Sequence, residues 1–506
     1  MPLPVSAAPA GEVQAFPLSH EVAKPVSGPD GNVWSIDTTN ARLMRITPTG
    51  GVTYVTVPDP GTGLAGLAAG SDGNLWTLAK GVHRLIRVTP EGQVTTFALT
   101  PFGGSEFMDI AAGPDGNLWV GMTDTAVSPD ANYFFRVSTS ATNGEFFNAS
   151  TGWFITDMTS ATSGVYFAHN TGADIGRIQS DGTLSTMPGT PIAFGIAEGP
   201  DRRVWVTPVF AANLEAWTPG AGSTTSYPTD GGSPADEVVT GADGNLWYTT
   251  SPGGTRTIAR MSATGGSRAA YTAGLPAGGL VMGMTAASDG SVWATFSLGG
   301  TPSIARIGTG VDRLARATLD GSGLAGSEHR CAVAVEATGL GAVRAQAWSW
   351  FADGAKIAGA DTAVYVPAGD LTGKALTCRA SLTFEVALTQ AGFTSSAVTV
   401  RAATPTPANG GSSSGAAPKR LKASWARKGS KVTATFRAVS GAPRNVIRAT
   451  RKGSPARTGT CTVRTVKRAR TVTCRITLPK GRWTVAAEAR RGATPVARAT
   501  RAYRMG

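Results

Sequence analysis

Histidine is the side chain that most readily exchanges protons near neutral pH, and this sequence of 506 residues contains only four. His20 follows the first expected strand, His83 stands in a loop, His169 comes shortly after Tyr166, and His329 lies far downstream. A lone histidine is more often a surface or hydrogen-bonded structural residue than a catalyst, and only His169 is expected near a mouth of the fold. The repetitive part of the chain shows no Ser-His-Asp order, phosphate-binding loop or clustered metal-ligand motif, so we predict no catalytic set and no metal site there.

The elements that must position any site follow from a repeated phrase. It reads GPDGNLW at Gly113–Trp119, and near-copies open at Gly28, Gly70 and Gly241. Asp tolerates the bridge region and Gly supplies the positive φ of a tight turn, so the phrase predicts a turn between two strands, with its Trp beginning the second. A strand of the form I-x-R-I, a second turn such as that at Thr89, and a strand such as QVTTF follow. Each unit therefore has four strands.

Seven such units are found when the sequence is aligned on the large aromatic residue that begins the second strand. Four-stranded units with a period of about 40 residues are the signature of a propeller, in which each blade buries its aromatic side chain against the next. The sequence therefore predicts an all-β protein in which residues 11–310 form a seven-bladed β-propeller. The aligned aromatic residues are Trp34, Trp76, Trp119, Tyr166, Trp205, Trp247 and Trp293.

Closure of this ring is also visible in the sequence. The seventh unit has its I-x-R-I strand at Ile304–Ile307, but no strand of the form G-x-V-x-x-F follows it. Gly11–Phe16 reads GEVQAF and is an orphan copy of that missing strand. We infer that the N-terminal strand completes the last blade as its outer strand, which leaves the ring without an open edge.

An Arg recurs in the third strand of six units, and only the fifth unit lacks it, where LEAW fills the place. A ligand-binding residue would break the repeat, so we interpret this Arg as structural. We expect it to pair with a neighbouring turn Asp or to stack on an aromatic ring. The six residues are Arg45, Arg87, Arg136, Arg177, Arg260 and Arg306.

The inner strands of the repeat are expected to present side chains at the mouth of the central channel. Three of these side chains are carboxylates, which could hold a hard cation or a basic ligand. The alternative is that they are solvated carboxylates around a wet channel. The candidate residues for binding at the mouth are Lys24, Asp109, Asp157, His169, Phe194 and Glu237, and Met108, Thr156 and Met282 stand beside them.

Units of the form G-P-D-G-x-L-W, followed by I-G-R-I and G-x-V-T-x-F, resemble those of the streptogramin B lyase (virginiamycin B lyase) family of seven-bladed propellers. The stretch IGRIQSDGTLST at Ile175 is especially similar, and the resemblance covers residues 11–310. It implies a lyase that opens a cyclic depsipeptide antibiotic by elimination at its ester linkage, using a divalent metal, two His and a Glu. The repeat is shared by non-enzymatic propellers, so the resemblance specifies the fold better than the activity.

The residues implied for that activity are not kept. Matched on the inner strands, the family's two His fall on Glu237 and Met282, and its Glu falls on Leu280. Met and Leu cannot exchange a proton, and Glu237 alone cannot replace the set. Of the positions that match the family's W-F-T-E ending, only Asp37 keeps an acid. We therefore expect no cofactor, and Mg²⁺ only if a lyase with a rearranged site is present.

Charge is distributed very unevenly along the chain. Residues 1–310 carry 14 Lys and Arg against 24 Asp and Glu, residues 311–403 carry 8 against 8, and residues 404–506 carry 24 against 1. The basic character therefore belongs to the C-terminal part, where it should attract polyanions such as wall polymers, anionic lipid surfaces or extracellular nucleic acid. Aromatic residues are sparse there, which argues against sequence-specific reading of nucleic acid. The alternative is a composition bias displayed on a solvated surface.

Four cysteines fall in two pairs outside the repeats, Cys331 with Cys378 and Cys461 with Cys474. Neither spacing suits a zinc site, so we predict two disulfides and an oxidising compartment. The N-terminus lacks the cationic start and apolar core of a signal peptide, which we expect to have been removed or left out. No run of about 18 apolar residues predicts a transmembrane segment.

The remaining residues predict two further β domains. In residues 311–403, short alternating strands with a Cys–Trp–Cys order resemble an Ig-like β-sandwich. Residues 404–418 have the composition of a linker, and residues 419–506 alternate at period two, as in a small basic β-sandwich. From the sequence we favour a secreted or cell-envelope binding or scaffold protein, with an unidentified ligand at the propeller mouth. The alternative is a metal-dependent lyase acting on a streptogramin B.

Overall fold

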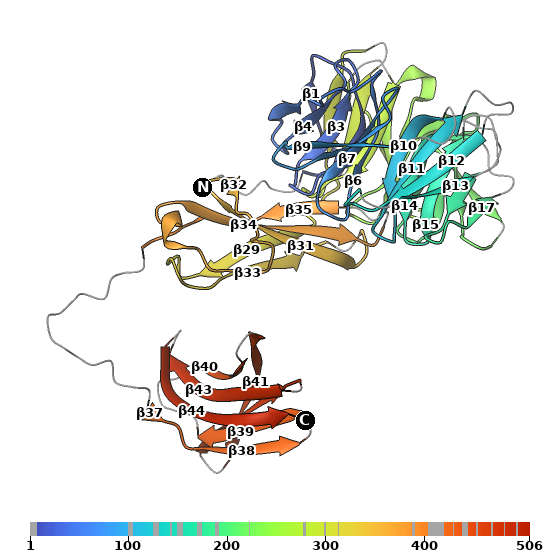
Figure 1. The fold of residues 1–506 in the computed structure, drawn as a ribbon. Coiled ribbons are helices and arrows are strands. Elements are labelled where there is room, and N and C mark those ends of the chain that lie inside the picture. Colours follow the sequence, from blue (N-terminus) through green and yellow to red (C-terminus); the bar gives the residue numbers. More distant parts are fainter. Residues whose placement is uncertain are drawn as a thin grey trace. The chain divides into compact units, whose positions relative to one another are not determined.

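The computed structural model describes residues 8–505 apart from 100–104, 125–130, 142–143, 149–154, 170–174, 188–191, 222, 277–279, 298–299, 312, 338, 387–389, 403–418, 429, 438–443, 452–453, 467–468, 480 and 492–493. The chain divides into two compact units, Met1–Thr404 and Pro405–Gly506 (Figure 1). The linker predicted at 404–418 lies outside the described residues.

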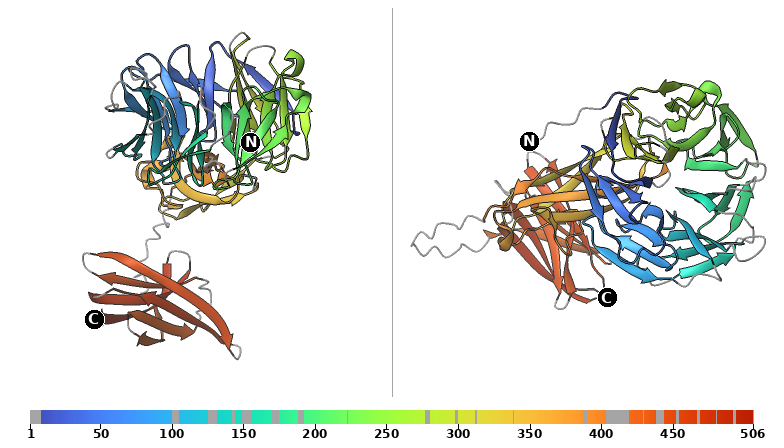
Figure 2. Two further views of the ribbon diagram at one scale, coloured as in Figure 1. Left: turned by 90° about the vertical axis from the view of Figure 1, so that its right-hand side faces the viewer. Right: turned by 90° about the horizontal axis from the view of Figure 1, so that it is seen from above.

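The first unit begins with seven four-stranded antiparallel sheets, the blades of a propeller. Each inner strand contacts the inner strand of the next blade, and the last contacts the first, so the blades close a ring (Figure 2, right). This confirms the predicted all-β propeller. The strands of the ring are β1 (Val13–Pro17), β2 (Val22–Ser27), β3 (Val33–Asp37), β4 (Arg42–Ile46), β5 (Val52–Val55), β6 (Leu64–Ala69), β7 (Leu75–Ala79), β8 (Arg84–Val88), β9 (Val94–Ala98), β10 (Glu106–Ala112), β11 (Leu118–Asp124), β12 (Ala131–Val137), β13 (Gly144–Asn148), β14 (Ile155–Ala161), β15 (Gly164–His169), β16 (Ile175–Ile178), β17 (Leu184–Met187), β18 (Ala193–Glu198), β19 (Val204–Pro208), β20 (Asn213–Trp217), β21 (Thr224–Pro228), β22 (Ala235–Thr240), β23 (Leu246–Thr250), β24 (Thr257–Met261), β25 (Ala269–Tyr271), β26 (Leu280–Ala286), β27 (Val292–Ser297) and β28 (Ser303–Ile307), with short 3-10 turns at Asp230–Gly232 and Pro252–Gly254.

The last blade has the sheet order β1-β28-β27-β26, so the N-terminal strand is its outer strand, as the sequence predicted. Val13 pairs with Ile307 and Pro17 with Ser303. The ring of Phe16 stacks on Trp293 of the same blade with centroids 5.7 Å apart. Both ends of the propeller are therefore held in one sheet, and the ring has no open edge between its first and last blades.

The repeated phrase builds a turn that holds the blade's tryptophan. In the sixth blade, Asp243 accepts hydrogen bonds from the Trp247 indole nitrogen at 3.0 Å and from the Asn245 backbone at 3.2 Å. Gly244 takes a φ of 73°, which favours glycine. A Cβ at Gly241 would lie 2.6 Å from the Trp247 ring. The phrase recurs because its Asp, its two glycines and its Trp fit one another, and the seven aromatic residues at this position are all fully buried.

The recurrent Arg of the third strand is structural, as expected. Arg45 pairs with Asp30 at 2.8 Å, and Arg306 pairs with Asp289 at 2.6 Å. In the fifth blade, which lacks this Arg, Arg203 of the turn lies over the tryptophan ring at 4.8 Å and supplies the missing guanidinium. The others lie over the Trp or Tyr ring of their own blade at 5.6 to 5.9 Å, and these are Arg87, Arg136, Arg177 and Arg260.

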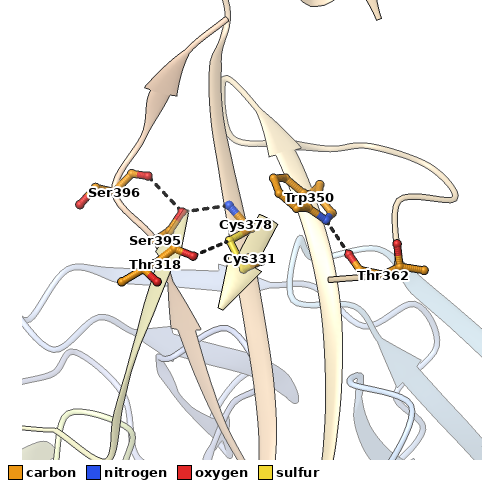
Figure 3. The surroundings of a disulfide bond; sticks show 7 residues. All are labelled: Thr318, Cys331, Trp350, Thr362, Cys378, Ser395 and Ser396. Atoms are coloured by element: carbon orange, nitrogen blue, oxygen red, sulfur yellow. Dashed lines mark hydrogen bonds between the residues drawn. A yellow bond between two sulfur atoms is a disulfide. The ribbon is translucent and has the colours of Figure 1, made fainter. Parts of the chain in front are cut away.

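Two further sheets complete the first unit, and we call this part, Ala315–Thr399, the cap. Cys331 of one sheet and Cys378 of the other form the predicted disulfide, and the fully buried Trp350 lies beside them and donates to the Thr362 carbonyl at 2.8 Å (Figure 3). The sheet orders are β29-β30-β33 and β32-β31-β34-β35, with β36 against β34. The strands are β29 (Ala315–Gly321), β30 (His329–Val335), β31 (Val343–Ala352), β32 (Ala355–Lys356), β33 (Val364–Tyr365), β34 (Ala375–Phe384), β35 (Gln390–Thr394) and β36 (Val398–Thr399), with a 3-10 turn at Gly369–Leu371.

The cap packs on the end of the ring that carries the repeated turns. Leu382 and Phe384 of the cap share an apolar cluster with Ala242 and Ala286 of the ring. The backbones of the cap and the ring approach each other closely here. A Cβ at Gly392 of the cap would lie 2.0 Å from the carbonyl oxygen of Pro29 in the turn of the first blade. The cap therefore covers one end of the central channel.

The second unit contains one continuous run of eight strands, ordered β37-β44-β43-β40-β41-β42-β39-β38. The long β41 pairs with β40 through its first half and with β42 through its second half, so it joins two layers around a shared apolar core. Cys461 lies directly opposite Cys474 and forms the second predicted disulfide. The strands are β37 (Lys419–Arg420), β38 (Ala423–Lys428), β39 (Lys431–Arg437), β40 (Arg444–Arg451), β41 (Ser454–Val466), β42 (Ala469–Thr477), β43 (Gly481–Arg491) and β44 (Thr494–Met505).

Two disulfides indicate a protein of an oxidising environment. Across the described residues, no helix is long and apolar enough to cross a membrane.

Candidate functional site

One position of the inner strand lines the central channel in every blade. It stands two residues before the residue that pairs with the blade's buried Trp or Tyr. All seven inner strands have a register shift at or beside this position. Such a bulge re-aims a side chain and is common next to functional sites. In chain order the seven residues are Lys24, Gly66, Asp109, Asp157, Gly195, Glu237 and Gly283. Four blades thus present a charge to the channel and three present no side chain.

Lys24 bridges two of these carboxylates across the channel. Its Nζ lies 2.9 Å from Asp109 Oδ2 and 2.5 Å from Asp157 Oδ1, which joins the first blade to the third and fourth. Burial alone would lower the pKa of Lys24, but the charges and hydrogen bonds of Asp109 and Asp157 outweigh it and raise the pKa above its ordinary value. Lys24 also holds a φ of 52°, a left-handed conformation that is costly for a residue with a side chain.

Asp157 and Glu237 are held partly in their protonated forms by the channel. Burial raises the pKa of Asp157 to about 6, with Asp109 adding to the rise and Lys24 opposing it. Burial also raises the pKa of Glu237 to about 8, and the negative charge of Asp157 contributes further. Within the described residues, the Glu237 carboxylate makes no ion pair. The positive charge of Lys24 thus offsets part of the negative charge of Asp109 and Asp157. Glu237 faces the channel without a counter-ion.

Below this charged layer lies a cavity of about 210 Å³ that extends toward the cap. Small apolar residues and hydroxyl side chains from the ends of the inner strands line it, together with Gln390 of the cap. The Gln390 side-chain amide donates to the carbonyl oxygens of Ala69 and Gly70, each at 2.7 Å. Ser27 lines the cavity with only 5% of its surface exposed, and its hydroxyl has no hydrogen-bond partner among the described residues.

The opposite end of the channel is flanked by exposed apolar side chains. Phe194, directly before Gly195 in β18, is 53% exposed, and Leu280 at the start of β26 is 54% exposed. Phe210, which follows the end of β19, is 87% exposed. Along the channel, the open apolar rim is therefore followed by the charged layer, and then by the cavity that extends to the cap.

The structure brings together four of the six predicted mouth residues, namely Lys24, Asp109, Asp157 and Glu237, which all line one cavity. Phe194 is exposed beside them and does not line this cavity. His169 ends β15, where its backbone pairs with Ile155, and its side chain lies outside the described part.

The other histidines have structural surroundings. His83 packs edge-on against Phe107 with ring centroids 5.4 Å apart. His329 is fully buried in the cap, where its Nε2 accepts from the Gly323 backbone at 3.1 Å. These contacts agree with the expectation that lone histidines are structural.

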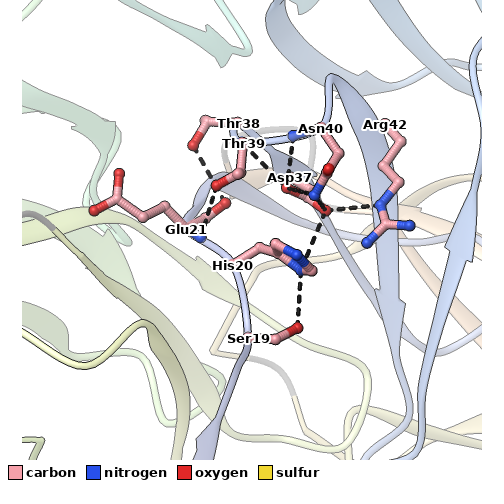
Figure 4. Close-up of polar contacts among 8 residues, drawn as sticks. All are labelled: Ser19, His20, Glu21, Asp37, Thr38, Thr39, Asn40 and Arg42. Carbon is pink, nitrogen blue, oxygen red and sulfur yellow. Dashed lines mark hydrogen bonds and ion pairs between the residues drawn. The ribbon is translucent and has the colours of Figure 1, made fainter.

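His20 lies near a serine and an aspartate, but their arrangement is not that of a catalytic triad (Figure 4). Ser19 Oγ is 2.8 Å and Asp37 Oδ2 is 3.9 Å from the same nitrogen, Nδ1 of His20. A triad needs the two partners on different ring nitrogens. Burial would raise the pKa of Asp37, but hydrogen bonds from Arg42 and Asn40 lower it below its usual range. Asp37, the acid kept from the W-F-T-E ending, is therefore occupied by its own turn.

The register of the strands refines the comparison with the family's histidine positions. Val239 pairs with Trp247, and Thr285 pairs with Trp293. Met282 is therefore equivalent to Asp236, whereas Glu237 is equivalent to Gly283. Both strands carry the same bulge, between Ala235 and Val238 and between Val281 and Met284, so the two residues matched to the family's histidines stand one position apart within their blades.

The residues that line the channel do not fit the divalent metal implied by the family. The Lys24 ammonium lies between Asp109 and Asp157, where a divalent cation would have to be held, and its charge would repel such an ion. Among the described residues, no three His, Cys, Asp or Glu side chains lie close enough together to hold a metal.

Ser27 and Gln390 belong to the cavity and were not predicted from the sequence. Ser27 ends an inner strand, and a count along that strand could have found it. Gln390 comes from the cap, more than 300 residues away from the backbone it contacts, and no repeat pattern points to it.

Comparison with known proteins gives one family and several similar folds. Residues 5–129 match the virginiamycin B lyase family. A streptogramin B lyase structure is 20% identical, with a TM-score of 0.48 over 59% of this chain and 97% of that one. A catalytically inactive virginiamycin B lyase from Staphylococcus aureus, solved with quinupristin, is 19% identical, with a TM-score of 0.49 over 59% of this chain and 99% of that one. The calcium-binding protein regucalcin from Agrobacterium tumefaciens is 15% identical, with a TM-score of 0.35 over 60% and 96%.

No curated protein matches the sequence significantly. The family match covers the N-terminal strand, the first two blades and the first two strands of the third, and their turns and buried tryptophans recur around the ring. The propeller is therefore similar to the virginiamycin B lyase family in its first part, residues 5–129.

Proposed function

We propose that this chain is an exported binding protein whose propeller channel recognises a small ligand. The observation that carries this proposal is the channel itself, in which four ionisable side chains from four blades line a cavity that extends to the cap. Two carboxylates and an ammonium in such an enclosed place are costly unless they serve a purpose, because desolvation opposes every charge. Buried charge in a concave site is typical of ligand recognition.

The residues found at the family's catalytic positions support binding in preference to elimination. Met282 and Leu280 have no group that exchanges a proton, and Leu280 is more than half exposed. Lys24 fills the place between two carboxylates that a divalent metal would need. These features leave the channel with charge for recognition and without the proton-transfer set of the lyase.

A lyase remains the second candidate because of one property of Glu237. Its pKa of about 8 allows this carboxyl group to exchange a proton near neutral pH, as a general acid or base must. The two candidates therefore make opposite predictions for one compound, a cyclic depsipeptide of the streptogramin B class.

The test is to incubate the full chain with a streptogramin B and Mg²⁺ and to follow ring opening by mass spectrometry. The binding function predicts that the compound stays intact. Opening by the native chain that is lost in Glu237→Gln, and kept in the exposed control Glu12→Gln, would overturn the proposal in favour of the lyase.

The second unit is proposed to attach the protein to an anionic surface such as a wall polymer or an anionic lipid layer. Its single acid, Glu488, is only 4% exposed, so it offers the surface little negative charge. The basic side chains described there are all exposed, and they are Lys422, Arg427, Lys428, Lys431, Arg448, Arg475, Arg501 and Arg504. A surface of this kind attracts polyanions through long-range charge. Together with two disulfides, it supports a place outside the cell.

A further inference from the structure

We propose that the ligand of the channel is a small organic ammonium ion, with its cationic nitrogen at Glu237 and its body in the cavity toward the cap. This inference rests on the proposed binding function and specifies the class of ligand. It is carried by the unpaired carboxylate and by the size and lining of the cavity.

The charges of the channel favour a cation over an anion. Lys24 is already paired with Asp109 and Asp157 at hydrogen-bond distance, so it has little attraction left for an anionic ligand. Glu237 has no ion-pair partner among the described residues and lies in the field of these two aspartates. Because Coulomb energies are larger in an enclosed site than in bulk water, an ammonium beside Glu237 would be held strongly and a carboxylate would be rejected.

The lining of the cavity favours an organic cation over a metal ion. Beyond the four ionisable residues, the cavity is lined by small apolar residues of the inner strands, such as Ala111, Ala197 and Val239, and by hydroxyl residues such as Thr159 and Thr285. A hard metal ion needs six or more oxygen ligands, whereas an alkyl body suits such walls.

The cavity also limits the size of the ligand. Its volume of about 210 Å³ is below the roughly 300–1,000 Å³ of pockets for drug-sized molecules. Gln390, fixed by two hydrogen bonds to the ring backbone, closes the far end. A short alkylammonium ion fits this space, and a large cyclic peptide does not.

Binding of an ammonium ion should release a proton from Glu237. The charged groups that face this carboxyl are Lys24, Asp109 and Asp157 from the neighbouring inner strands and Asp236 from its own strand. Their combined effect with burial keeps Glu237 mostly protonated at neutral pH, since its pKa is about 8. A bound cation favours the ionised form, so we expect about one proton to leave for each ligand bound at pH 7.

The experiment uses the full chain and three probes of equal length: n-butylammonium, n-butanol and butyrate. Calorimetric titration at pH 7 in two buffers with different ionisation enthalpies gives both the affinity and the protons released. Each probe is titrated into the native chain, into Glu237→Gln and into the control Glu12→Gln, which removes an exposed carboxylate outside the channel. Circular dichroism confirms that the variants are folded.

We expect n-butylammonium to bind the native chain and Glu12→Gln, and to release a proton in both cases. It should bind Glu237→Gln at least tenfold more weakly and release no proton. The inference is overturned if n-butanol or butyrate binds as tightly, if Glu237→Gln keeps the affinity, or if none of the three probes binds. None of these results decides the proposed function, which fails separately if the chain opens the depsipeptide ring.

Discussion

The Nζ atom of Lys24 lies 2.5 Å from Oδ1 of Asp157, and this contact ties the first blade to the fourth across the centre of the ring. The same ammonium reaches Asp109 of the third blade at 2.9 Å. Blades contact their neighbours through apolar clusters, so a link between blades that are not adjacent is an addition to the ordinary packing of the propeller. The charged layer is therefore a structural tie as well as a recognition element.

Removal of the Lys24 ammonium should destabilise the ring. In Lys24→Met, Asp109 and Asp157 would face each other without a counter-charge, at a cost of about 2–4 kcal/mol, somewhat less than for a fully buried pair because Lys24 is partly exposed. Lys24→Gly should lose about 1 kcal/mol less than Lys24→Met, because glycine accepts the positive φ at this position. Denaturant unfolding of both variants measures the two effects.

Lys80→Met is the matched control, since Lys80 stands in a turn of the second blade, outside the channel. If Lys24→Met were as stable as Lys80→Met, the bridge would contribute nothing to the fold.

Glu237 should make the stability of the first unit depend on pH. Its pKa is about 8 in the folded chain and near 4.5 when unfolded, so the folded state binds the proton more tightly. Stability is therefore highest below about pH 4.5 with respect to this group, and falls as the pH rises toward 8. Glu237→Gln should match the native melting temperature at pH 5 and exceed it at pH 9. A variant that melts below the native chain at pH 9 would contradict this assignment.

The fold could be predicted further than the site. The GPDGNLW phrase specifies its own turn, since its Asp, Gly and Trp contact one another within seven residues, and the orphan strand at Gly11–Phe16 completes a pattern that the seventh blade lacks. The alignment on the Trp also identified Lys24 and Glu237 as channel residues.

Contacts made by residues outside the repeats could not be predicted from the sequence. Gln390 lines the cavity from the cap, more than 300 residues away from the backbone that it contacts. The packing of the cap on the ring has no signal in hydrophobic periodicity, which reports only the face on which a side chain lies.

The turn Asp should contribute to stability through the tryptophan that it holds. Asp243→Ala would leave the buried Trp247 indole N–H without a partner and would break the contact with Arg260, for a loss of about 2 kcal/mol. Asp181→Ala is the control, because this exposed Asp accepts a hydrogen bond from Thr183 and holds no tryptophan. Equal unfolding free energies for the two variants would show that the Asp–Trp contact is not what maintains the repeat.

Phe16 should hold the ring closed from the outer strand of the last blade. Phe16→Ala removes its stacking on Trp293, which we expect to cost about 2 kcal/mol because the ring is only partly buried. Hydrogen exchange should then quicken in β26, β27 and β28. The control is Phe146→Ala, an outer-strand phenylalanine of the third blade that is 40% exposed. Unchanged exchange in the last blade of Phe16→Ala would mean that β1 does not need this side chain to pair.

The basic second unit should confer binding to anionic polymers that weakens as salt is added. Residues 1–404 carry an excess of acids, so the 24 basic residues beyond them supply the attraction. The chain shortened to residues 1–404, one of the two compact units, should pass through a phosphocellulose column at low salt, while the full chain is retained and elutes as the chloride concentration rises. Each phosphate neutralised releases counter-ions, so log affinity should fall linearly with log salt. This role for the second unit would be ruled out if the shortened chain were retained. It would also be ruled out if the full chain eluted at the same salt concentration from polymers of different charge.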